Sequence, residues 1–116
     1  SISLGSANVT FSGTAPTVSS GFGTSPTVAG TATAFRVDVG TGGSATAGVL
    51  TMPTAATAWN CHVENLTGTL GNYANQRTVQ LSSTTTTVTI ENQTISTGAA
   101  LAWTASDIVA LLCAAY

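Results

Sequence analysis

Apolar and polar residues alternate with a period of two along much of the chain from residue 35 onward. Phe35, Val37 and Val39 alternate with Arg36 and Asp38, and a glycine-rich stretch at 40–43 ends this run. Such alternation is typical of strands that bury one face and expose the other. We expect further strands at 46–52, 59–65, 76–81 and 85–91. No window shows a sustained helical period, so the pattern predicts an all-β fold, an antiparallel β-sandwich or jelly roll.

Two of the expected strands carry predicted partners. Segments 76–81 and 85–91 flank a short polar stretch at 82–84, which predicts a hairpin. In this hairpin Val79 and Leu81 would face Val88 and Ile90 across the two strands. The strand at 59–65 has an apolar face and a polar face, formed respectively by Trp59, Cys61 and Val63 and by Asn60, His62 and Glu64.

The last expected strand, 108–113, is apolar at successive positions. A strand without polar alternation is typical of one that is covered on both faces. We therefore expect it to be buried on both sides. One of its two faces would be covered by another copy of the chain, which makes Ile108, Ala110 and Leu112 candidates for a subunit interface.

The first 34 residues differ in composition from the rest. They are rich in serine, threonine, glycine and alanine, and they contain a short repeat, GTAPTV at 13–18 and GTSPTV at 23–28. Proline in both copies disfavours helix and central-strand positions. We expect residues 1–34 to form an extended N-terminal arm and residues 35–116 to form the β-sandwich domain. The repeat is interpreted either as low-complexity coincidence or as part of an arm that packs along a neighbouring subunit.

The small number of charged residues excludes several classes of function. The 116 residues suit a single domain, only 5% of them are charged, and there is no lysine. A chain with two arginines lacks the basic surface that nucleic acids or anionic membranes require. The apolar run from 108 to 116 is also too short for a helix that crosses a bilayer. A surface so poor in charge predicts that much of it is covered by partners.

The sequence offers little for catalysis or metal binding. His62 is the only histidine, and His62 with Glu64 forms an H-x-E pair without the P-C-x-x-C half of the zinc deaminase signature. Cys61 would point to the opposite side of the strand from His62, which argues against a shared metal. No nucleophile elbow or phosphate-binding loop is present. We expect no enzymatic activity, no metal and no cofactor.

Two further features remain open. Cys61 and Cys113 are either two buried free thiols or a disulfide between neighbouring strands. The polar segment 66–77 contains an aromatic residue, amides and an arginine, and such a group suits a sugar or a surface epitope. Its alternative is an ordinary solvent loop or a subunit contact. The candidate ligand or partner residues are Asn72, Tyr73, Asn75 and Arg77.

Several segments also carry a likeness to a known family. They are 23–30 (GTSPTVAG), 37–42 (VDVGTG), 58–61 (AWNC), 82–90 (SSTTTTVTI) and the strand that ends at 112–113. Together they resemble a β-rich surface module of tailed-bacteriophage virion proteins, found in capsid decoration or cement proteins and in tail-fibre ends. The resemblance covers residues 23–116, and the cysteines lie where that module often carries them. The family's last strand usually closes with a basic residue, whereas this chain ends in Ala114, Ala115 and Tyr116.

The resemblance implies a trimeric or otherwise multimeric β-structure on the virion surface, without catalysis. The favoured interpretation is a small capsid decoration protein that binds itself and the major capsid protein after assembly in the host cytoplasm. The first alternative is the receptor-binding tip of a tail fibre, whose partner would be a host surface glycan. A free carbohydrate-binding module is a third interpretation, and it predicts a monomer.

Overall fold

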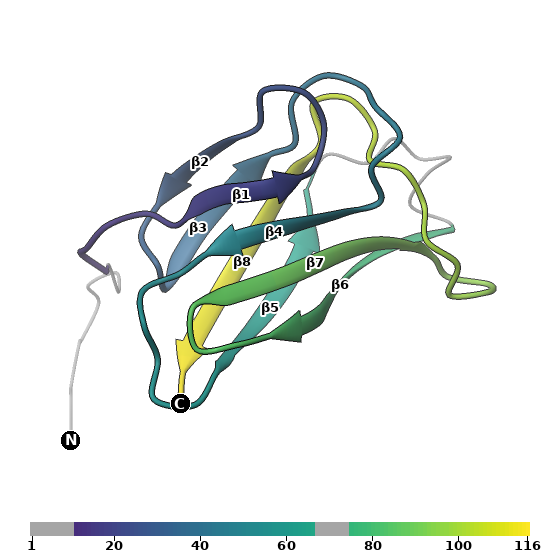
Figure 1. The fold of residues 1–116 in the computed structure, drawn as a ribbon. Helices are drawn as coiled ribbons and strands as arrows, with labels where there is room; N and C mark the ends of the chain where they lie inside the picture. The colour runs from purple at the N-terminus through teal and green to yellow at the C-terminus, as the bar shows by residue number, and fades with distance from the viewer. Residues whose placement is uncertain (1–10, 67–74) are drawn as a thin grey trace, which may run out of the picture.

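The structure, a computed structural model, describes residues 11–66 and 75–116. Within these ranges it contains strands and no helix, in two four-stranded sheets of order β1-β4-β7-β6 and β2-β3-β8-β5 (Figure 1). Every pair of neighbouring strands is antiparallel. This confirms the all-β class and is consistent with a β-sandwich, whereas the jelly roll stays a prediction. The strands are β1 (Thr17–Gly21), β2 (Thr27–Gly30), β3 (Ala34–Asp38), β4 (Ala47–Thr51), β5 (Trp59–Asn65), β6 (Gln76–Ser83), β7 (Thr87–Thr94) and β8 (Ile108–Ala115).

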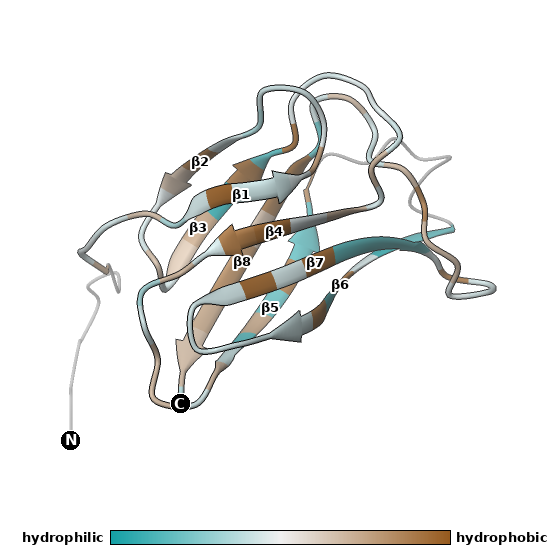
Figure 2. Ribbon diagram, viewed as in Figure 1, coloured by the Kyte–Doolittle hydropathy of each residue, from teal (hydrophilic) through white to brown (hydrophobic). Residues whose placement is uncertain are grey.

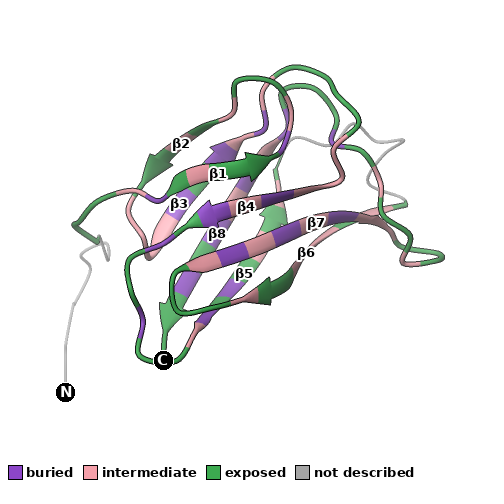
Figure 3. Cartoon of the chain, in the orientation of Figure 1, coloured by how far each residue is buried: buried purple, intermediate pink, exposed green. Residues whose placement is uncertain are grey.

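The core lies between the two sheets and follows the period-two pattern of the sequence. Along β7 the inward residues Val88, Ile90 and Asn92 are buried, and the residues between them are half-buried (Figure 3). Trp59 and Cys61 of β5 are buried, as predicted for their face. Both tryptophans, Trp59 and Trp103, belong to the core. The buried hydrophobic residues are Phe22, Phe35, Val37, Val39, Leu50, Met52, Ala55, Trp59, Cys61, Val88, Ile90, Trp103, Val109, Leu111 and Cys113.

Phe22 shows how a loop between the sheets contributes to this core. It follows β1 with a φ of 59°, and its side chain is only 2% exposed. Its ring lies 5.4 Å from the ring of Trp103. It also covers Gly48 of β4 so closely that a Cβ at Gly48 would overlap the ring. Glycine is therefore required at position 48 by packing.

The N-terminal stretch differs from the expected arm. Residues 17–21 pair with β4 as β1, and residues 27–30 pair with β3 as β2. The expected domain boundary at residue 35 falls inside β3. Residues 17–34 therefore belong to the sandwich, because their backbones complete both sheets although their side chains are small. The first ten residues of the expected arm lie outside the described residues.

The β6–β7 hairpin forms, but its register differs from the prediction. Val79 lies opposite Glu91, and the partners of Ile90 and Val88 on β6 are Gln80 and Ser83. The register shifts between Gln80 and Ser82. A shift of one residue exchanges the two faces of a strand. The expected facing of Val79 and Leu81 with Val88 and Ile90 is therefore wrong, and Gln80 takes an inward position.

Strand β8 is not buried on both faces within one chain. Its burial alternates: Val109, Leu111 and Cys113 are buried, whereas Ile108 and Ala110 are half-buried and Leu112 is 53% exposed. The β2-β3-β8-β5 sheet has only one face against the core, so the second apolar face of β8 points outward. The expectation of two-sided burial is wrong for the single chain. The outward face of β8 is apolar and exposed to solvent, so it is the first place to look for a partner.

Candidate interaction surface

The outward face of the β2-β3-β8-β5 sheet carries an apolar stripe along β8. We call Ile108, Ala110 and Leu112 the β8 stripe. Strand β8 is the third of four strands, with β3 on one side and β5 on the other, and its visible parts are in the hydrophobic colours in Figure 2. Exposed apolar groups that lie together on a sheet face often mark an interaction site. All three candidate interface residues from the sequence are thus brought together on one face.

The neighbours of the β8 stripe are set by the strand register. Leu112 lies between Ala34 of β3 and His62 of β5. Ala110 lies between Arg36 of β3 and Glu64 of β5. The stripe is therefore bordered on each side by a strand that carries polar or charged groups on the same face.

A shallow hollow of about 460 Å³ opens on this face. The outward residues that line it come from three strands: Ala34 from β3, His62 and Glu64 from β5, and Ala110 and Leu112 from β8. Small side chains at positions 34 and 110 leave the space. The hollow suits an apolar side chain of a partner better than a sugar, because the residues that line it contain no aromatic ring other than the imidazole of His62.

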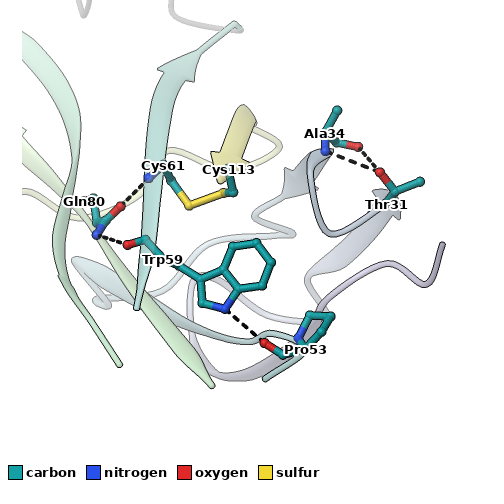
Figure 4. Close-up of a disulfide and its surroundings, with 7 residues drawn as sticks. All are labelled: Thr31, Ala34, Pro53, Trp59, Cys61, Gln80 and Cys113. Carbon is teal, nitrogen blue, oxygen red and sulfur yellow. Dashed lines mark hydrogen bonds between the residues drawn. A yellow bond between two sulfur atoms is a disulfide. The ribbon is translucent and has the colours of Figure 1, made fainter. Parts of the chain in front are cut away.

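The two cysteines lie on the other, buried side of β5 and β8. They face each other in the register and form a disulfide, with S–S 2.05 Å and Cα–Cα 4.1 Å (Figure 4). Cys113 N donates to Thr33 O at 2.7 Å, and Cys61 N donates to Gln80 Oε1 at 2.6 Å. Both N–H groups thus point away from the opposite cysteine, as in a non-hydrogen-bonded pair, where antiparallel strands come closest. Of the two alternatives that the sequence left open, the structure has the bridged one.

The edge of β5 is closed by a side chain from the other sheet. Besides accepting from Cys61 N, Gln80 donates from Nε2 to Trp59 O at 3.0 Å (Figure 4). One amide group therefore satisfies a donor and an acceptor of the edge strand, as a neighbouring peptide would. Trp59 Nε1 donates to Pro53 O at 3.0 Å at the same end of the sandwich. These bonds hold β5, and with it one border of the β8 stripe, to the opposite sheet.

The candidate ligand loop is only partly described. Asn72 and Tyr73 lie outside the described residues. Asn75 is exposed just before β6, and its carbonyl accepts from Ile95 N at 3.0 Å. Arg77 Nε donates to Gln93 Oε1 at 3.0 Å on the surface of the other sheet. Of the two described residues of this set, Arg77 belongs to β6 and Asn75 directly precedes it, and β6 is in the sheet opposite the β8 stripe.

The described residues give no sign of a metal site or a membrane span. No three of their histidine, cysteine and acidic side chains are grouped so as to hold a metal ion. Cys61 is engaged in the disulfide, and His62 points to the opposite face of β5. Over the same part of the chain, no helix has the length and apolarity to cross a bilayer.

Sequence reasoning missed two polar contacts that shape this sheet. One is the contact of Gln80 with the β5 edge. The other is Asp107, which is only 2% exposed and accepts from Asn65 Nδ2 at 3.0 Å next to the start of β8. Both join residues far apart in the sequence, and each residue is common on surfaces, so no local pattern marks them. Comparison with protein-family models, curated proteins and solved structures finds no match to this chain.

Proposed function

We propose that this protein is a non-enzymatic structural subunit of a bacteriophage virion, a small capsid decoration or cement protein that associates with copies of itself on the capsid surface. The observation that carries the proposal is the outward β8 stripe, in which Leu112 is 53% exposed. An apolar sheet face on a chain with so few charges would favour association or precipitation if it stayed open to water. Coverage by a second copy removes that apolar area from water.

The resemblance to virion surface modules supplies the rest of the proposal. Decoration proteins of that kind form trimers or other multimers, and we propose the same for this chain. The partners are the chain itself and the major capsid protein. Few charges are available at such contacts, so attachment to the shell should depend little on salt.

The N-terminal arm in this proposal is shorter than the 34 residues that composition indicated, because residues from Thr17 onward belong to the sheets. We propose that the residues that precede β1 contact an edge of the capsid shell through backbone hydrogen bonds. A deletion through residue 22 would remove β1 and the buried Phe22, so it would test folding and attachment together. A deletion of residues 1–10 leaves every described strand intact and is the appropriate variant.

Two measurements test the proposed function. Imaging of intact virions that contain the chain should locate it in many copies over the capsid shell. A position at the end of a tail fibre would instead support the receptor-binding alternative and overturn the decoration proposal. In a rebinding assay to particles stripped of the protein, the chain lacking residues 1–10 should fail to attach while its free energy of unfolding is unchanged. Attachment that survives the deletion would remove the arm from the proposal.

A further inference from the structure

Three charged residues border the β8 stripe: Asp38 of β3 lies opposite Ile108, and Arg36 and Glu64 form a matched pair on either side of Ala110. Arg36 and Glu64 are both exposed, and both lie in the row of Ala110, Arg36 on β3 and Glu64 on β5. Neighbouring strands are about 4.8 Å apart, so the two charges start from backbones roughly 10 Å apart with a small apolar residue midway. In the row of Ala110 the β3 border is therefore positive and the β5 border negative, while Asp38 places a negative charge on the β3 border in the row of Ile108.

We propose that copies of this chain associate around an axis parallel to β8, so that Arg36 of each copy meets Glu64 of the next across the β8 stripe. This inference rests on the self-association in the proposed function and specifies its geometry. The occupant of the outward face is thus a second copy of the chain.

The symmetry follows from the register. A rotation about an axis that runs parallel to β8, on the solvent side of the stripe, keeps each residue at its height along the strand. It brings the β3 border of one copy against the β5 border of the next, so Arg36 faces Glu64. Two copies form two such pairs and three copies form three, because each copy supplies one border of each kind.

The alternative face-to-face arrangement has the opposite charge pattern. A two-fold axis that runs parallel to the sheet on its solvent side, and crosses the strands at right angles over the row of Ala110, would set Arg36 against Arg36 and Glu64 against Glu64. Like charges opposed at an interface disfavour an arrangement. The charges therefore select one orientation among those that would bury the same apolar stripe.

The apolar groups supply the affinity in this arrangement, and the charges supply its orientation. Leu112 projects from the face, and the hollow of about 460 Å³ lies beside it. Because the axis keeps each residue at its height, the β8 stripes of neighbouring copies face each other, and Leu112 of one copy lies level with Leu112 and the adjoining hollow of the next. Exposed ion pairs add little binding energy, so their main effect is on which orientation forms.

The test is a charge exchange measured by sedimentation velocity on the purified full-length protein. Arg36→Glu and Glu64→Arg should each weaken self-association by about tenfold, because every contact then opposes like charges. The double variant R36E/E64R should return to within about threefold of the original chain, since the pairs are restored with their signs exchanged. Arg77→Glu, on the other sheet, is the matched control and should leave association unchanged.

The outcomes separate this inference from the proposed function. A double variant that associates no better than the single variants, or single variants that associate normally, would overturn the axis parallel to β8. Attachment of the original chain to capsids, measured separately, would still uphold the decoration proposal in that case. Recovery in the double variant supports the axis whether the copies number two or three. At a protein concentration low enough for every variant to be monomeric, the unfolding curves should coincide, which shows that the changes act on association and not on folding.

Discussion

Replacement of Gln80 by alanine tests how the edge of β5 is held. The side-chain amide of Gln80 is half-buried, and it spans from β6 in one sheet to β5 in the other. Alanine would keep the strand register of β6 and remove the amide together with the one methylene group that carries it. The Cys61 N–H and the Trp59 carbonyl would then lose their partner, at a position where the side chains of both residues are buried.

The expected loss of stability follows from the two hydrogen bonds. Their lengths are 2.6 and 3.0 Å, and a typical protein hydrogen bond contributes about 0.5–1.5 kcal/mol net. Two bonds therefore predict a decrease of about 2 kcal/mol in the free energy of unfolding. Access of water to the freed edge would bring the loss toward the lower end of about 1–3 kcal/mol.

The assay is equilibrium denaturation, with amide hydrogen exchange at Cys61 as a local readout. Gln93→Ala is the matched control, because Gln93 bonds to the side chains of Arg77 and Glu91 and not to the backbone of β5. This control should lose less than about 0.5 kcal/mol. The reasoning would be refuted if Gln80→Ala lost no more than Gln93→Ala, or if the Cys61 amide exchanged no faster.

Two further predictions concern covalent and steric limits of the core. The Cys61–Cys113 bridge closes a sequence separation of 52 residues, for which the chain-entropy model gives a stabilisation of about 4 kcal/mol. Reduction of the bridge, or replacement of both cysteines by alanine, should lower the free energy of unfolding by roughly that amount. A loss below about 1 kcal/mol in calorimetry or denaturation would contradict this expectation. Gly48→Ala should cost about 1–3 kcal/mol, because the new Cβ overlaps the Phe22 ring that packs on Trp103. The smaller ring-free side chain of Phe22→Leu should recover part of that loss in the double variant, and the absence of any recovery would show that the overlap is not the cause.

The strands with alternating sequence were predictable because their signal is local. The apolar face of β5, with Trp59 and Cys61, follows from residue spacing alone, and the structure buries both. Strands β1 and β2 have small side chains and no alternation, so their place in the sheets depends on partners that are distant in the sequence. Composition indicated an arm there for the same reason.

Register and pairing were harder to predict. One irregularity between Gln80 and Ser82 moved Val79 out of its expected position, because strand faces alternate with every residue. The cysteines could be paired only once β5 and β8 were known to be neighbours. The candidate interface residues of β8 were found from the sequence because an apolar strand face needs cover. The sequence alone did not show that Arg36 and Glu64 lie on opposite sides of Ala110, because this depends on the register of three strands.

Self-association through the β8 stripe can be separated from general stickiness of exposed leucines with one pair of variants. Leu112 on β8 and Leu81 on β6 are almost equally exposed, at 53% and 54%, but they lie in different sheets. Molar mass should be measured by light scattering over a range of concentrations for the original chain, Leu112→Asp and Leu81→Asp. We expect a multimer for the original chain and for Leu81→Asp, and a folded monomer for Leu112→Asp. A monomeric original chain, or a Leu112→Asp variant that remains multimeric, would contradict this expectation.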